Sequence, residues 1–78
     1  MNRKELMDVL TEVDGKWSVF KHHGDYMAKP NDPDPTFGSN YEYVGTIDLD
    51  ELKLESHNQK NVSLSLIKKH LDFLEEWN

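Results

Sequence analysis

The chain has 78 residues, no cysteine and a net charge of −6 from nine basic and fifteen acidic residues. Its length predicts one domain with a modest core, and the absence of cysteine excludes disulfides, thiolate metal sites and thiol catalysis. The N-terminal stretch is charged throughout, and no apolar run has the length of a membrane-spanning helix. We therefore expect a cytoplasmic protein that does not associate with membranes.

The negative charge is concentrated in the middle of the chain. Residues 24–55 contain eight acidic and two basic residues, whereas the charges cancel within residues 1–23 and within residues 56–78. Binding to phosphate backbones depends on Lys and Arg, so this distribution argues against direct nucleic-acid binding. An acidic surface is instead complementary to a basic surface on another protein.

A helix is predicted over residues 3–13. Asn2 followed by Glu5 is typical of a capping box, and Asp14-Gly15 marks the end of the apolar repeat. The apolar residues of this segment recur on one helical face: Leu6, Val9, Leu10 and Val13. One neighbouring surface can cover such a narrow stripe.

Strands are predicted over residues 17–22, 25–29, 41–48 and 51–55. Aromatic and β-branched residues stand on both sides of Gly24, which indicates a hairpin that turns there. Neighbouring strands joined in this way pair antiparallel.

The segment from residue 41 to residue 55 alternates in two phases. Its first part places every second residue on one face: Tyr41, Tyr43, Gly45, Ile47 and Leu49. Leu52 and Leu54 continue the alternation shifted by one position. The shift predicts a turn or bulge near Asp48–Glu51 that separates two strands.

The final segment, residues 63–77, has the wide apolar face of an amphipathic helix. Its first stripe consists of Leu64, Ile67, Leu71 and Leu74. A second stripe beside it consists of Leu66, His70, Phe73 and Trp77. One stripe can face a sheet, and the other needs the first helix or another molecule to cover it.

Together these elements predict a small α+β domain over residues 1–78. An N-terminal helix, an antiparallel sheet of three or four strands and a C-terminal amphipathic helix form two layers. Both helices are expected on one face of the sheet.

Residues 30–40 form a long predicted loop that contains all three prolines of the chain. The prolines favour a stiff projection, and Phe37 is an apolar residue in a polar stretch. Long loops are often binding loops, although most loops only connect elements. A contact surface and a solvated connection both remain open for this segment.

No residue pattern indicates catalysis or metal binding. The serines lack a nucleophile-elbow context, there is no glycine-rich phosphate loop, and the histidines lack the spacing of a zinc site. The stretch from Asn31 to Pro35 carries oxygen ligands but lacks the Gly and Glu positions of a calcium loop. We predict a non-enzymatic protein with no catalytic residue, no metal site and no cofactor.

The function predicted from these features is that of a small acidic protein-binding module, which docks onto a basic surface of a larger partner protein. In its narrower form the protein is an inhibitor that occupies a nucleic-acid-binding surface, with carboxylates in place of phosphates. The residues expected to touch the partner are Asp32, Asp34, Phe37, Tyr41, Glu42, Tyr43, Asp48, Asp50, Glu51 and Glu55.

A structural homodimer is the alternative prediction. Leu66, Phe73 and Trp77 on the second stripe of the C-terminal helix would then meet their counterparts across a two-fold axis. In that case the acidic middle of the chain serves solubility.

Overall fold

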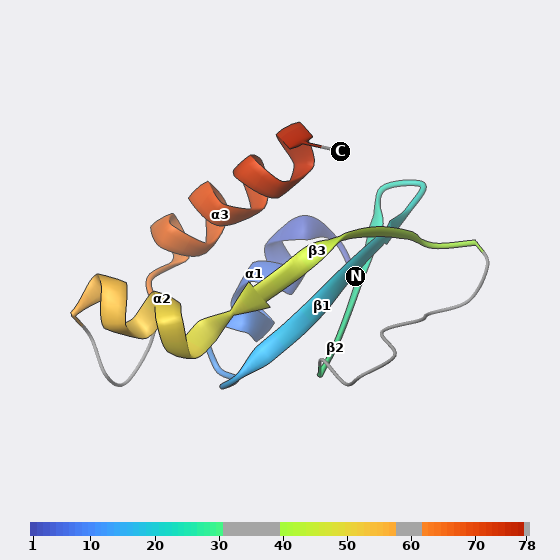
Figure 1. Cartoon of the computed structure of the whole chain (residues 1–78). Coiled ribbons are helices and arrows are strands. Elements are labelled where there is room, and N and C mark those ends of the chain that lie inside the picture. The colour runs from blue at the N-terminus through green and yellow to red at the C-terminus, as the bar shows by residue number, and fades with distance from the viewer. Residues whose placement is uncertain (31–39, 58–61, 78) are drawn as a thin grey trace.

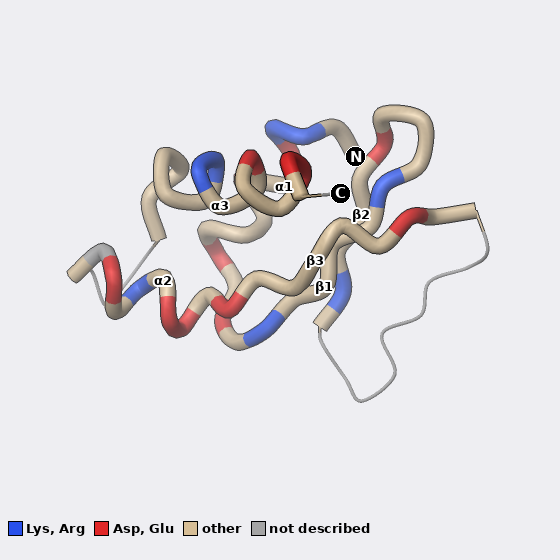
Figure 2. The backbone as a smooth tube through the Cα atoms, turned by 45° about the horizontal axis from the view of Figure 1, so that its top comes forward, with Lys and Arg blue, Asp and Glu red and all other residues tan. Residues whose placement is uncertain are grey.

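A three-stranded antiparallel sheet carries two of the three helices on one face (Figures 1 and 2). The structure is a computed structural model, and it describes residues 1–30, 40–57 and 62–77. The elements in chain order are α1 (Arg3–Leu10), β1 (Lys16–His22), β2 (Asp25–Pro30), β3 (Glu42–Asp48), α2 (Leu49–Ser56) and α3 (Leu64–Trp77). The predicted α+β architecture in two layers is confirmed.

The capping box predicted for α1 is present. The Asn2 side chain accepts a hydrogen bond from the Glu5 backbone N–H at 2.8 Å, and the Glu5 carboxylate accepts one from the Asn2 N–H. The helix ends at Leu10, three residues earlier than predicted. Its end tightens into an i→i−3 turn, in which the Glu12 N–H donates to the Val9 carbonyl at 3.0 Å, and the Thr11 hydroxyl donates to the Asp8 carbonyl.

Strands β1 and β2 form the predicted hairpin. His23 and Gly24 both have positive φ, 48° and 83°, and they form a two-residue turn whose twist suits a hairpin. The outer edge of β2 pairs with the N-terminus of the chain, because the Tyr26 N–H donates to the Met1 carbonyl at 2.7 Å. This contact covers hydrogen-bonding groups that would otherwise template association with another strand.

Strand β3 ends at Asp48, where a turn was predicted, and it also contains a bulge that the alternation did not indicate. Val19 of β1 pairs with Gly45, whereas the next residue, Phe20, pairs with Tyr43, so Val44 is bulged. Gly45 therefore faces α3, and a Cβ at this position would lie 2.8 Å from a methyl group of Leu74. The expectation that Tyr43 and Gly45 share one face is wrong, because the bulge turns the strand between them.

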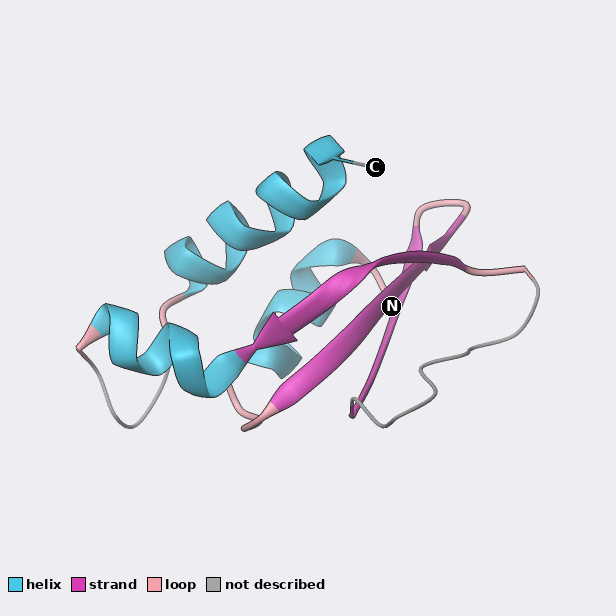
Figure 3. Ribbon diagram, viewed as in Figure 1, coloured by secondary structure: helices cyan, strands magenta, loops and turns pink. Residues whose placement is uncertain are grey.

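The predicted fourth strand at residues 51–55 is wrong. This segment belongs to α2, which continues directly from β3 (Figure 3). The Asp48 side chain accepts a hydrogen bond from the Glu51 N–H and so caps the helix, which ends where His57 adopts a left-handed φ of 59°. The alternation of Leu52 and Leu54 was misleading, because Leu52 is buried in the helix and Leu54 is 71% exposed.

The core lies between the sheet and the helices. Its most deeply buried apolar side chains come from every layer: Leu6, Leu10, Val19, Ile47, Leu49, Ile67 and Leu71. In α3 the first predicted stripe faces this core, with Ile67 and Leu71 fully buried and Leu74 packed against them. The stripe prediction is confirmed for these three residues, while Leu64 at the first turn is half exposed.

Capping by Asp48 is testable by a pair of substitutions. Asp48→Ala is expected to lower the free energy of unfolding by about 1 kcal/mol, because the N–H groups of the first turn of α2 lose their acceptor. Asp48→Asn keeps an oxygen acceptor and is expected to retain most of the stability. Urea unfolding followed by circular dichroism measures both, and equal losses in the two variants would contradict the capping role.

Candidate protein interface

Glu75 of α3 is the centre of a polar network that reaches three other elements. Its carboxylate accepts a hydrogen bond from the Tyr26 hydroxyl of β2 at 2.5 Å and lies 3.4 Å from Lys21 Nζ of β1. Arg3 of α1 lies 3.5 Å from the same carboxylate and also pairs with Asp72. One edge of α3 is thereby joined to α1 and to the sheet.

The pKa shifts of Tyr26 and Asp72 keep both groups in the protonation state that these contacts require. Burial and the hydrogen bond to the Glu75 carboxylate raise the pKa of Tyr26 from 10.0 to about 12, which keeps its hydroxyl a donor over the physiological range. Hydrogen bonds from Arg3 and Lys68 lower the pKa of Asp72, which keeps this carboxyl charged.

In the orientation that these contacts give α3, part of its second apolar stripe faces solvent. Phe73 is 54% exposed and Trp77 is 76% exposed, and their ring centroids lie 6.0 Å apart. Leu66 and His70, nearer the start of the helix, are only partly exposed. The predicted second stripe is thus half covered at its beginning and open at its end.

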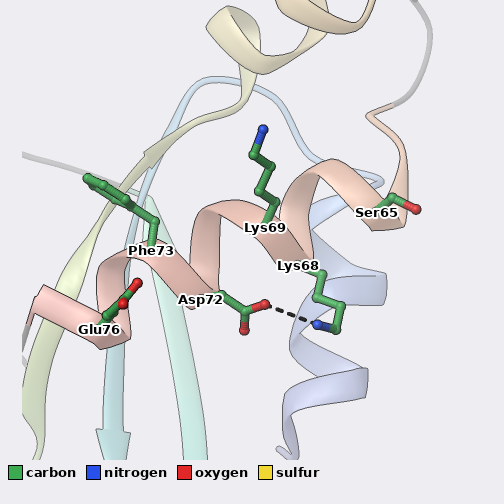
Figure 4. Close-up of a pocket in the computed structure, with 6 residues that line it drawn as sticks. All are labelled: Ser65, Lys68, Lys69, Asp72, Phe73 and Glu76. Atoms are coloured by element: carbon green, nitrogen blue, oxygen red, sulfur yellow. Dashed lines mark hydrogen bonds and ion pairs between the residues drawn. The ribbon is translucent and has the colours of Figure 1, made fainter.

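A groove between α2 and α3 has the exposed Phe73 ring in its lining. It has a volume of about 140 Å³ and is lined by residues of both helices: Leu52, Glu55, Leu66, Lys69, His70 and Phe73. An adjoining depression of about 440 Å³ lies over α3 itself, between Ser65 and Glu76. Figure 4 shows Lys69 and Phe73 projecting from the same side of α3, while Lys68 and Asp72 pair on another side.

This arrangement suits a protein contact better than small-molecule chemistry. The depression over α3 is shallow and lies along a single helix, so it would leave most of a small ligand in solvent. Exposed aromatic side chains next to charged ones are instead typical of protein interfaces.

The acidic residues predicted to touch a partner have divided roles. Asp48 caps α2, and the Asp50 carboxylate accepts a hydrogen bond from the Gly15 N–H at 3.2 Å. Glu42, Glu51 and Glu55 are exposed. Figure 2 shows acidic positions recurring along α2. The predicted contact residues Asp32, Asp34 and Phe37 lie outside the residues that the structure describes.

Tyr41 and Tyr43 lie on the sheet face opposite α1 and α3. Tyr43 packs against Phe20 with ring centroids 5.5 Å apart, and Tyr41 packs against His22 at 5.3 Å. Tyr43 is half exposed, and its hydroxyl hydrogen-bonds to Thr46. Among the described contact residues, Asp50, Glu51 and Glu55 thus lie on α2 and the two tyrosines on this outer face of the sheet, so they do not form one surface.

The sequence did not point to the network of Tyr26, Arg3 and Glu75. These residues are far apart in the chain, and no local pattern in the sequence relates them to one another. The amphipathic periodicity of α3 did indicate Phe73 and Trp77 as residues in need of a partner.

Within the described ranges, no group of three or more His, Asp or Glu side chains is placed to hold a metal ion. No helix in this part of the chain combines the length and apolar character needed to cross a membrane. Comparisons with protein-family models, with curated proteins and with solved structures found no match. The proposal for function therefore depends on the surface itself.

The contact between Tyr26 and Glu75 predicts an alkaline dependence of stability. Tyr26→Phe is expected to lower the free energy of unfolding by about 1–2 kcal/mol at neutral pH, because a buried hydrogen bond to a charged group is lost. Because the pKa is raised in the folded protein, this contribution is complete below about pH 10 and is lost as the pH rises through about 12.

Denaturant unfolding of the wild type and Tyr26→Phe across the alkaline range measures the effect. Tyr43→Phe, which removes a half-exposed hydroxyl on the other face of the sheet, is the matched control. A constant difference between wild type and Tyr26→Phe at all pH values would refute the contact.

Proposed function

We propose that the chain is a small acidic protein-binding module, without catalytic chemistry, that docks onto a basic surface of a larger partner protein. The observation that carries the proposal is the exposure of Phe73 and Trp77 on a helix whose orientation is held by Glu75. Trp and other aromatic residues often supply most of the binding energy in protein interfaces.

The acidic side chains of α2 supply the complementary charge. Glu51 and Glu55 are exposed, and Glu55 lines the groove that Phe73 also lines. An arginine of a partner can stack on an aromatic ring while its guanidinium pairs with a carboxylate. The groove between α2 and α3 offers Phe73 and Glu55 for this purpose.

The net charge of −6 supports the same kind of partner. Complementary potentials raise the rate of encounter and disfavour acidic partners. The narrower proposal is an inhibitor of a nucleic-acid-binding protein, in which Glu51 and Glu55 together with Asp32 and Asp34 take the place of phosphates. Asp48 and Asp50 contribute less to this surface, because both hydrogen-bond to the backbone of the protein itself.

A second candidate is a homodimer formed through α3. It is favoured by the position of Phe73 and Trp77 on one helical stripe, because a two-fold axis beside such a stripe buries each ring against the other copy. Leu66, also predicted to belong to this contact, is already partly covered.

The acidic-module proposal is tested by charge reversal on α2. A partner is first captured from the native host with the wild-type protein and identified by mass spectrometry, and its affinity is then measured over a range of salt concentrations. Glu51→Lys/Glu55→Lys is expected to weaken binding at least about tenfold and to reduce its salt dependence.

Asp8→Lys/Glu12→Lys is the control, since it makes the same change of charge at exposed positions in and just after α1. We expect this variant to bind nearly as the wild type does. If the two double variants lose affinity equally, the loss comes from the change in net charge and not from the position of Glu51 and Glu55, and the proposed docking surface is wrong.

A further inference from the structure

We propose that a second copy of this chain covers the exposed side of α3, with the two α3 helices antiparallel. The surface involved, here named the α3 stripe, consists of Leu66, Lys69, Phe73, Glu76 and Trp77. This inference rests on the second candidate function and specifies its geometry. It is carried by the charges that border the two aromatic rings.

The charge of α3 changes sign along its length. Its charged residues are basic in the first half and acidic in the second half: Lys68, Lys69, Asp72, Glu75 and Glu76. Most of these charges have partners within the chain. Lys68 pairs with Asp72 at 3.0 Å, Asp72 also pairs with Arg3, and Glu75 joins the network with Tyr26.

Lys69 and Glu76 differ from these residues. Both are exposed, and neither forms an ion pair within the parts of the chain that the structure describes. They stand four residues before and three residues after Phe73, which places all three side chains on one side of the helix. The ring of Phe73 is therefore bordered by an available cation on one end and an available anion on the other.

In an antiparallel pair of α3 helices, the basic half of each copy faces the acidic half of the other. If the two-fold axis passes close to Phe73, Lys69 of each copy lies opposite Glu76 of the other, and the two Phe73 rings meet between the two ion pairs. Lys69 and Glu76 are separated by seven residues, or about 10.5 Å along the helix, so both pairs fit within two turns. A parallel arrangement would place like charges opposite each other.

The shape of the surface agrees with this arrangement. The depression of about 440 Å³ over α3 is lined by Lys69, Phe73 and Glu76, next to the projecting Phe73 ring (Figure 4). A projection beside a depression on the same helix lets each copy place an aromatic ring into the depression of the other. Trp77, which is 76% exposed, is thereby brought against the aliphatic part of Lys69 of the second copy.

Reversal and exchange of the two charges test the inference. Sedimentation equilibrium at low ionic strength gives the dimer dissociation constant of each protein. Lys69→Glu and Glu76→Lys are each expected to weaken the dimer about tenfold, because each creates two pairs of like charges. The double variant Lys69→Glu/Glu76→Lys is expected to return to within about threefold of the wild type, because the pairs form again with the charges exchanged.

Two further variants separate this contact from general effects. Lys4→Glu makes the same change of charge on α1 and is expected to leave the dissociation constant nearly unchanged. Phe73→Ala removes the central ring and is expected to give a monomer. Because Phe73 is half exposed in the monomer, this variant should keep the circular dichroism spectrum of the wild type, and its thermal unfolding should match that of the wild type at dilutions where both proteins are monomeric.

A wild-type protein that stays monomeric at high concentration overturns the inference, as does a double variant that remains as weak as the single ones. These failures are distinct from a failure of the acidic module. A monomer that binds a basic partner and loses this binding with Glu51→Lys/Glu55→Lys contradicts only the dimer. If the double variant Lys69→Glu/Glu76→Lys restores the dimer and the protein binds no basic partner, the result supports the homodimer as the function.

Discussion

The carboxylate of Glu75 fastens α3 in the orientation that buries its first apolar stripe. The helix has two adjacent apolar stripes, and a sheet can cover only one of them completely. Contacts from Glu75 to Tyr26, Lys21 and Arg3 attach one edge of the helix to β2, β1 and α1. Rotation of α3 toward its second stripe would remove a charged group from these partners, which is unfavourable at a partly buried position. Together with the burial of Ile67 and Leu71, this attachment leaves Phe73 and Trp77 on the exposed side of the helix.

The surface that remains combines two kinds of side chain. The end of α3 presents Phe73 and Trp77, and α2 presents the exposed Glu51 and Glu55, of which Glu55 lines a groove together with Phe73. The net charge alone overstates the acidic surface, because Asp48 and Asp50 hydrogen-bond to the backbone near the junction of β3 and α2. A contact with another protein molecule is therefore expected to combine an aromatic centre with charged borders, as is common in interfaces.

Local signals in the sequence predicted the fold where neighbouring residues decide it. The Asn2 capping box, the His23-Gly24 turn and the periodicity of α3 are such cases. The strand expected at residues 51–55 was wrong because Asp48 caps a helix that begins at Leu49, which the alternation of Leu52 and Leu54 does not reveal. The bulge at Val44 was missed because it depends on pairing with β1. The exposed aromatic residues were predictable from the width of the apolar face. The attachment at Glu75 was not, because its partners become neighbours only after folding.

The orientation of α3 is tested most directly by the exposure of its side chains in the monomer. In NMR spectra of dilute protein, a soluble paramagnetic agent broadens the resonances of protons that face solvent. The account predicts strong broadening of the Phe73 ring and the Trp77 indole, with little effect on the Leu71 methyl groups and a smaller effect on the Trp17 indole, which donates to the Asp14 carbonyl. Protection of Phe73 and Trp77 to the level of Leu71 in a folded monomer would contradict the account.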